Sequence, residues 1–177
     1  MDFIAFDFET ANASRNSAVS LALTVVRNDQ IVDEFYSLLN PHTDFHWRNV
    51  QIHGIRATDV IDAPTFSELW PVIAPFFAPD KLVIAHNAPF DNSVLKASLA
   101  ANDISLPSYQ SLDTVRVAKK AFPNLSNHKL NTVAEYLQIP LDHHHNALDD
   151  SVAAANILLQ INQQFGAAMA QPFIKLV

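Results

Sequence analysis

Hydrophobic residues gather in a few short runs along the chain, and the spacing within each run predicts its secondary structure. Four runs predict strands: residues 2–10, 18–29, 31–41 and 81–87. The first three are joined by short turns, including Asn28-Asp29, which indicates an antiparallel three-strand meander. The run at 81–87 is continuously apolar, which is typical of a strand buried on both faces.

Apolar residues at helical spacing predict the remaining elements. The segments that predict helices are residues 65–77, 89–102, 129–139 and 147–165, while residues 109–122 begin as a strand and become helical. Pro71 and Pro75 lie within the first helix, so we expect it to be kinked or broken. A meander followed by strands alternating with helices indicates an α/β domain with a mixed sheet, over residues 1–170, with a short tail at 171–177.

Composition narrows the classes of function. The 177 residues include no cysteine, which excludes disulfides and cysteine-ligated zinc. Eleven basic and eighteen acidic residues give a net charge of −7, so a contact with nucleic acid should be short and local, or bridged by cations. We find no secretory signal and no apolar run of about 20 residues, and therefore expect a soluble cytoplasmic protein without a membrane partner.

Two carboxylates interrupt the first predicted strand, in the sequence IAFDFETAN at residues 4–12. Alternation along a strand puts Asp7 and Glu9 on the face of Phe3 and Ala5, with the two acidic Cα atoms about 6.6 Å apart. Two like charges so close are costly in a low-dielectric setting, and no Lys or Arg is nearby in the local sequence. A divalent cation would neutralise them; alternatively, the strand ends in solvent.

Two further acids head the apolar faces of predicted helices. Asp91 shares a face with Val94 and Leu95, and Asp150 lies four residues before Ala154 on the stripe of the last helix. An acid in a first helical turn also complements the helix dipole, which is sufficient for one Asp. Three segments that deliver carboxylates to one region instead indicate oxygen ligands for Mg²⁺ or Mn²⁺, and two such ions about 4 Å apart support phosphodiester hydrolysis.

Three consecutive histidines precede the last predicted helix. His145 lies close before Asp150, and a histidine beside an activated water can take its proton at neutral pH. A polar loop or adventitious metal binding is the ordinary interpretation of such a run. We keep that interpretation for His143 and His144 and assign the catalytic hypothesis to His145.

Three motifs carry these residues: DFET at 7–10, HNAPFD at 86–91 and HNALDD at 145–150. In this order they resemble the motifs of DEDDh 3′→5′ exonucleases, the superfamily of the DNA polymerase III epsilon subunit and of ribonuclease T. The segments HGI, DAPTF, LDTVRVAKKAFP and KLNTVAEYLQI also resemble connecting segments of this family. The resemblance covers roughly residues 2–165, although Ala11-Asn12 replaces the usual Thr-Gly after DFET.

The resemblance implies a fold and a reaction. The fold is ribonuclease H-like, with a five-stranded mixed sheet, made of the meander and two parallel strands, flanked by helices. Two Mg²⁺ or Mn²⁺ ions would be held by Asp7, Glu9, Asp91 and Asp150, and His145 would be the general base. The enzyme would hydrolyse terminal phosphodiesters of single-stranded nucleic acid, DNA in preference to RNA, to nucleoside 5′-monophosphates.

Four residues beside the ligands are expected to touch the substrate. The resemblance implies that the backbone of Thr10 contacts the terminal nucleotide and that Asn87 orders the site, although Asn87 is equally suited to capping a helix. Phe8 and Phe90 carry aromatic faces that could stack on unpaired bases. The alternative is that they belong to the core, which we favour for Phe8 and leave open for Phe90.

Two other functions remain open at this stage. The chain could be an accessory module that keeps the fold without turnover, or an exonuclease that trims RNA and short oligoribonucleotides. The resemblance to ribonuclease T also implies a possible homodimer. The apolar tail at 172–177 would then pack either on a partner or on its own domain.

Overall fold

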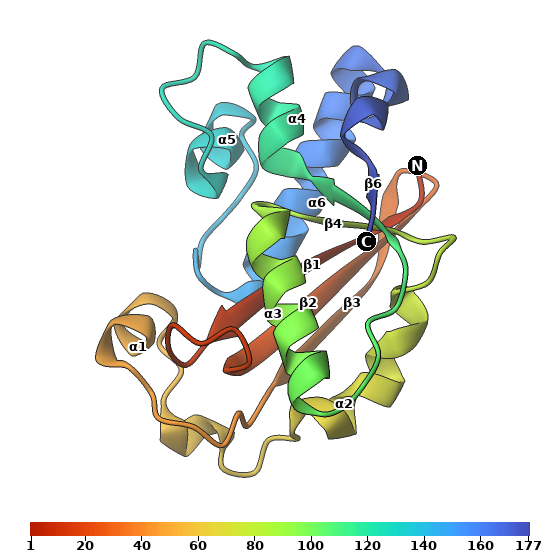
Figure 1. Cartoon of the computed structure of the whole chain (residues 1–177). Helices are drawn as coiled ribbons and strands as arrows, with labels where there is room; N and C mark the ends of the chain where they lie inside the picture. The colour runs from red at the N-terminus through yellow and green to blue at the C-terminus, as the bar shows by residue number, and fades with distance from the viewer.

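The sheet of the computed structural model, which describes residues 1–177, has six strands in the order β3-β2-β1-β4-β5-β6 (Figure 1). β1 lies in the middle of the sheet and pairs antiparallel with β2 and parallel with β4. The predicted meander, the two parallel strands and the mixed sheet are confirmed. The strands are β1 (Phe3–Thr10), β2 (Ala18–Arg27), β3 (Gln30–Leu38), β4 (Leu82–Ala85), β5 (Gln110–Asp113) and β6 (Lys175–Leu176).

The prediction of five strands is wrong by one, because the C-terminal tail adds β6 to the sheet edge. β6 runs antiparallel to β5, with Lys175 opposite Ser111. The backbone N–H of Val177 also donates to the carbonyl oxygen of Tyr109 at 2.9 Å. A two-residue strand with exposed side chains has no hydrophobic period, so the sequence pattern could not reveal it. Of the two packing alternatives for the tail, the structure shows contact with its own sheet.

Helices cover both faces of the sheet, and α3 crosses in front of the strands in Figure 1. The hydrophobic cluster on one face includes α2 and α3, and that on the other includes α4, α5 and α6. None of these helices is long and apolar enough to cross a lipid bilayer. The helices are α1 (Trp47–His53), α2 (Phe66–Ile73), α3 (Ala88–Ala101), α4 (Thr114–Ala121), α5 (Leu130–Tyr136) and α6 (Ala147–Phe165), with 3₁₀ turns at Ala57–Val60, Ala74–Phe76, Ala167–Met169 and Gln171–Phe173.

The predicted break in the helix over residues 65–77 is confirmed. α2 ends at Ile73, and a 3₁₀ turn that contains Pro75 follows directly. α2 begins with a reciprocal capping box. The backbone N–H of Glu68 donates to Thr65 Oγ1, and the Thr65 N–H donates to Glu68 Oε2.

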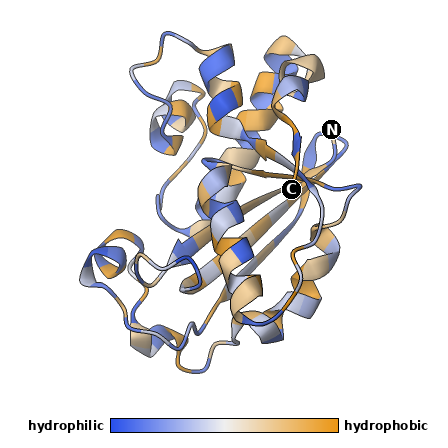
Figure 2. Ribbon diagram, viewed as in Figure 1, coloured by the Kyte–Doolittle hydropathy of each residue, from blue (hydrophilic) through white to orange (hydrophobic).

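The alternation of β1 decides what each face of the sheet presents. Phe3 and Ala5 pack in the cluster with α6, whereas Ile4, Phe6 and Phe8 pack in the cluster with α3. Because the side-chain period of a strand is two, the positions that continue the α6 face beyond Ala5 carry the two acids of DFET. In Figure 2 the carboxyl-terminal end of β1 is hydrophilic, although the strand lies at the centre of the molecule.

Small side chains let α6 lie close against β1 and β2. Ala147, Ala153, Ala154 and Ala155 are all buried, and the helix contacts both strands extensively. The hydroxyls of Ser151 and Thr24 share a buried hydrogen bond of 2.8 Å, which fixes the register of the helix on β2. This contact sets the position of Asp150, the residue before Ser151, at the end of β1.

We expect Leu158→Ala to lower the free energy of unfolding by about 3 kcal/mol, because Leu158 of α6 is fully buried and its loss leaves a cavity. Chemical denaturation monitored by circular dichroism measures this change. Val72→Ala is the matched control, since Val72 on α2 is 57% exposed and its substitution should cost less than about 1 kcal/mol. Equal effects of the two substitutions would contradict the burial of Leu158 between α6 and the sheet.

Candidate active site

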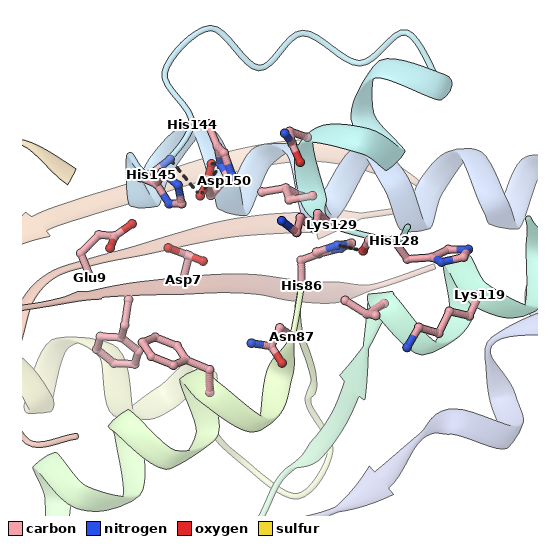
Figure 3. A pocket seen from close by; sticks show the side chains of 15 residues that line it. Asp7, Glu9, His86, Asn87, Lys119, His128, Lys129, His144, His145 and Asp150 are labelled. Carbon is pink, nitrogen blue, oxygen red and sulfur yellow. Dashed lines mark hydrogen bonds and ion pairs between the residues drawn. The ribbon is translucent and has the colours of Figure 1, made fainter. Parts of the chain in front are cut away.

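A cavity of about 770 Å³ opens at the edge of the sheet where the parallel strands β1, β4 and β5 end. The carboxyl ends of parallel strands commonly form ligand sites, because the loops that follow them diverge there. Figure 3 shows carboxylates at one end of this cavity and a lysine at the other. Fifteen residues line it: Asp7, Phe8, Glu9, His86, Asn87, Phe90, Val115, Lys119, His128, Lys129, Leu130, Asn131, His144, His145 and Asp150.

Three of the four predicted ligands come together at the acidic end. Carboxylate oxygens of Asp7, Glu9 and Asp150 all lie within 4.8 Å of one another. Asp7 and Glu9 come from alternate positions of β1, and Asp150 comes from the first turn of α6. The structure therefore brings residues 141 positions apart in the sequence into one group of oxygen donors.

Asp91, the fourth predicted ligand, is held slightly differently. It is 2% exposed in the first turn of α3, and its Oδ1 accepts a hydrogen bond of 3.0 Å from the backbone N–H of Phe8. It neither lines the cavity nor belongs to the group of three carboxylates. Because it bonds to the residue between Asp7 and Glu9, it still joins α3 to the acidic stretch of β1.

Burial raises the pKa of all four predicted ligands, and repulsion by neighbouring carboxylates adds to this shift for Asp7, Glu9 and Asp91. Burial, with the charges of Asp150 and Asp91, raises the pKa of Glu9 to about 8, and burial raises that of Asp91 to about 8. Burial and the neighbouring carboxylates also hold the pKa of Asp7 well above its usual range. Burial raises the pKa of Asp150, although the hydrogen bond from His144 opposes this shift.

The donor set fits a hard divalent cation. No Lys or Arg forms an ion pair with any of the four acids, so neither of these cationic side chains relieves the repulsion among them. Carboxylate oxygens without cysteine are the ligands that Mg²⁺ and Mn²⁺ prefer. A cation bound among these oxygens would replace the protons that their raised pKa values otherwise retain.

The three histidines before α6 play different parts. His144 Nδ1 lies 3.1 and 3.2 Å from the two carboxylate oxygens of Asp150, while His143 contacts Asp149. His145 donates its backbone N–H to Asp150 Oδ2 at 3.2 Å, and its ring stacks on that of His144 with centroids 3.9 Å apart. Sequence reasoning missed the contact of His144, because nothing in a run of three histidines says which ring turns inward.

The side chain of His145 lines the cavity wall. Burial and the neighbouring His144 lower its pKa, although the charge of Asp150 opposes this. A lowered pKa keeps the imidazole neutral near pH 7, with one nitrogen free to act as a base. The backbone at His145 has a left-handed conformation, with φ of 70°, which turns the chain just before the helix begins.

Three of the four predicted substrate contacts, Asn87, Phe90 and Phe8, line the cavity. Asn87 is the N-cap residue of α3 in a left-handed conformation, but its side chain makes no capping hydrogen bond, which leaves the amide free. Phe90 is half-buried, and the guanidinium of Arg15 lies 4.4 Å from its ring centre. Phe8 is 2% exposed and packs edge-on against Phe6, so the core alternative describes its side chain.

Thr10 is buried and does not line the cavity. Its carbonyl oxygen accepts a hydrogen bond of 2.8 Å from Asn49 Nδ2 and lies 3.1 Å from His53 Nε2. Both partners belong to α1, which therefore packs on the end of β1 beside the carboxylates. The motif HGI contains His53, but its spacing gave no sign that this ring would reach Thr10.

The other end of the cavity contains basic residues that sequence reasoning did not select. Lys119 of α4 and Lys129, the N-cap residue of α5, line it together with His128. His86 follows β4 and lies between this end and the carboxylates in Figure 3. Lys119, Lys129 and His86 belong to the segments LDTVRVAKKAFP, KLNTVAEYLQI and HNAPFD, and His128 directly precedes the second of these. Their proximity follows only from the conformations of these segments in the fold.

Comparison with known families gives one match over most of the chain. The model of the exonuclease family named RNase_T matches residues 4–158. The DNA polymerase III PolC-type of Caldanaerobacter subterraneus subsp. tengcongensis is 31% identical over 162 residues, which are 90% of this chain and 11% of that protein. The chain thus spans about a tenth of the length of the curated relatives that it matches.

Comparison of structures confirms the ribonuclease H-like fold. Exonuclease X in complex with 5′ overhanging duplex DNA superposes with a TM-score of 0.79 and 22% identity, over 97% of this chain and 96% of that one. The nuclease domain of 3′hExo, a DEDDh family member bound to rAMP, gives a TM-score of 0.79 and 17% identity, over 93% and 92% of the two chains. At sequence identities this low, the similarity shows that the folds are shared.

We expect Glu9→Gln to stabilise the protein in EDTA increasingly as the pH rises from 5 to 8. The raised pKa means that the folded chain binds more protons than the unfolded chain between about pH 4.5 and 8, so Glu9 makes the wild type lose stability with rising pH. The difference in unfolding free energy between variant and wild type should grow by up to about 1.4 kcal/mol per pH unit.

Urea denaturation at each pH measures this difference. Glu34→Gln is the matched control for the loss of one glutamate side chain, because Glu34 lies exposed on β3. A pH-independent difference for Glu9→Gln would mean that Glu9 ionises as a solvent-exposed carboxyl does.

Proposed function

The chain belongs to the exonuclease family, and from this premise we propose that it is a divalent-metal-dependent 3′→5′ exonuclease of the DEDDh type. Its substrate is the 3′ end of single-stranded nucleic acid, and its products are nucleoside 5′-monophosphates. The observation that carries the proposal is the group of carboxylates from Asp7, Glu9 and Asp150 at the acidic end of the cavity. Such a group is costly to fold and no Lys or Arg pairs with it, which suits a catalytic use.

Asp7, Glu9 and Asp150 would hold the cation, and Asp91 would complete the ligand set from α3. Mg²⁺ or Mn²⁺ is the expected ion, with two ions per site. When bound, the ions neutralise the carboxylates and supply the Lewis acidity that phosphodiester hydrolysis needs. The hydrogen bond from Phe8 N–H holds Asp91 in place, and the contact of His144 holds Asp150.

His145 is the proposed general base. As a water oxygen attacks the terminal phosphorus, its proton passes to the neutral imidazole of His145, while the bond from phosphorus to the 3′-oxygen of the preceding nucleotide breaks. The departing 3′-oxygen takes up a proton, and the released nucleotide keeps the phosphate on its 5′ carbon. Asn87 and Phe90 would contact the substrate at the cavity wall.

DNA is the favoured polymer. The curated relatives are DNA polymerases, and Exonuclease X, with a similar fold, is in complex with DNA. The domain of 3′hExo is bound to rAMP, which keeps RNA as the competing substrate for this fold. Discrimination between the two rests on a contact at the 2′ position.

We expect the protein to shorten 5′-labelled single-stranded oligonucleotides from the 3′ end with Mn²⁺, and to leave them intact with EDTA. Asp7→Asn should lower the rate by roughly a hundredfold or more, because it removes a charge from the cation site. Denaturing gel electrophoresis of DNA and RNA of the same sequence measures both rate and polarity. Asp33→Asn, exposed on β3, is the control and should keep wild-type activity.

The outcomes are distinct. Internal cleavage or shortening from the 5′ end would contradict the proposed polarity, and faster loss of RNA would contradict the preference for DNA. Absence of cleavage of either polymer would favour an accessory module that keeps the fold without turnover. If Asp7→Asn unfolded the protein, Asp7 would be a structural residue.

We expect His145→Ala to lower the cleavage rate by about 10²–10⁴-fold, the usual size for loss of a general base, while leaving Mn²⁺ binding nearly intact. The rise in melting temperature with Mn²⁺ reports binding independently of turnover. His143→Ala is the matched control from the same loop, since His143 contacts only Asp149. A larger loss for His144→Ala than for His145→Ala would transfer the role of base to His144.

A further inference from the structure

The cavity has two ends of opposite charge, and the proposed reaction uses only one of them. The three carboxylates lie at one end, and Lys119 lies at the other, with Lys129 beside the line between them (Figure 3). Neither lysine takes part in an ion pair. Two unpaired cations on the wall of a cavity, in a chain of net charge −7, are a specific local exception to the overall charge.

The backbone that carries Lys129 is fixed against the sheet by His86. His86 Nε2 lies 2.9 Å from the carbonyl oxygen of His128, and its Nδ1 lies 2.8 Å from Thr114 Oγ1. Burial lowers the pKa of His86, so a neutral ring donates from Nε2 to the carbonyl and accepts at Nδ1 from the hydroxyl. The ring of His128 in turn contacts the carbonyl oxygen of Phe122 at 2.9 Å.

Lys119 is directed by the geometry of α4. Asp113 caps this helix by accepting from the N–H of Val115, and Val117 and Ala118 bury its inner face. Lys119 lines the cavity, whereas the adjacent Lys120 does not. In Figure 2 part of the α4 ribbon has the colour of strongly hydrophilic residues. The two lysines therefore approach the cavity from separate, ordered elements.

The chemistry of a 3′ end limits what these lysines can meet. In the proposed reaction the cleaved phosphodiester lies at the carboxylates, and the terminal nucleotide beyond it ends in a 3′-hydroxyl without a phosphate. Every other backbone phosphate of the substrate lies on the 5′ side of the cleaved bond. An anionic phosphate favours the lysine end of the cavity over the carboxylate end.

We propose that Lys119 and Lys129 form a subsite for a backbone phosphate on the 5′ side of the cleaved bond. This inference rests on the proposed 3′→5′ activity and adds the orientation of the bound strand in the cavity. The strand enters the cavity from the side of α4 and α5, and the terminal nucleotide lies toward the end of β1, where α1 packs on Thr10. The subsite explains how an acidic protein holds a polyanion through a short contact.

The first test replaces single phosphates by neutral methylphosphonates in a 5′-labelled DNA octamer, at each linkage on the 5′ side of the terminal one. For the wild type, neutralising one of the two nearest linkages should lower kcat/KM roughly tenfold. The double variant Lys119→Gln/Lys129→Gln should cleave the unmodified octamer about as slowly as the wild type cleaves the neutralised one. A methylphosphonate at that linkage should not slow the double variant further. Lys120→Gln is the matched control and should behave as the wild type.

The second test measures binding without turnover. In the Asp7→Asn background, anisotropy of a fluorescent dT octamer gives the dissociation constant at several salt concentrations. Loss of each lysine should reduce the slope of log affinity against log salt by about 0.7, the value for one phosphate contact on a single strand. Lys120→Gln should leave this slope unchanged.

The outcomes separate the two proposals. Cleavage by the wild type that is insensitive to every methylphosphonate, or equal sensitivity in the double lysine variant, would overturn the phosphate subsite and leave the exonuclease intact. If the wild type cleaved no oligonucleotide, the proposed function would fail. An unchanged salt slope in the lysine variants would overturn the subsite as well. A merely structural role of the lysines would lower the melting temperature without changing the pattern along the linkages.

Discussion

The structure depends on the burial of like charges at the end of its central strand. β1 lies between β2 and β4 and has helices on both faces, so its side chains have little access to solvent except at the cavity. Asp7 and Glu9 continue the face on which Phe3 and Ala5 pack, and Asp150 approaches them from α6. Desolvation raises the pKa of each carboxyl, and repulsion adds to this for Asp7 and Glu9, so a bound cation would stabilise the ionised group.

The rest of the fold holds these charges together against their repulsion. The buried alanines of α6 and the hydrogen bond between Ser151 and Thr24 press the start of that helix onto the sheet. From the other face, α3 places Asp91 under the N–H of Phe8. Hydrophobic packing on both faces of the sheet therefore stabilises the fold and offsets the cost of burying these acids. Such a local cost within a stable fold is typical of functional sites.

The charged residues are also distributed unevenly along the cavity. Acids lie where β1 ends, and the opposite side carries Lys119 from the last turn of α4 and Lys129 from the start of α5. A polyanion would favour the second region on electrostatic grounds, and would need cations at the first. This polarity depends on His86, which joins β4, α4 and the loop before α5 through its two ring nitrogens.

The sequence by itself determined the mixed α/β sheet, the broken helix at Pro75, the faces of β1 and the family, because periodicity and ordered motifs are local properties of the chain. It also selected Asp7, Glu9 and Asp150, since charges in apolar stripes are conspicuous. Only the tertiary structure decided that His144 turns to Asp150, that Asn49 and His53 reach Thr10, that Lys119 and Lys129 share a cavity with the acids, and that the tail adds β6. These contacts join residues distant in sequence, and their geometry follows from how helices pack on the sheet, which no local pattern encodes.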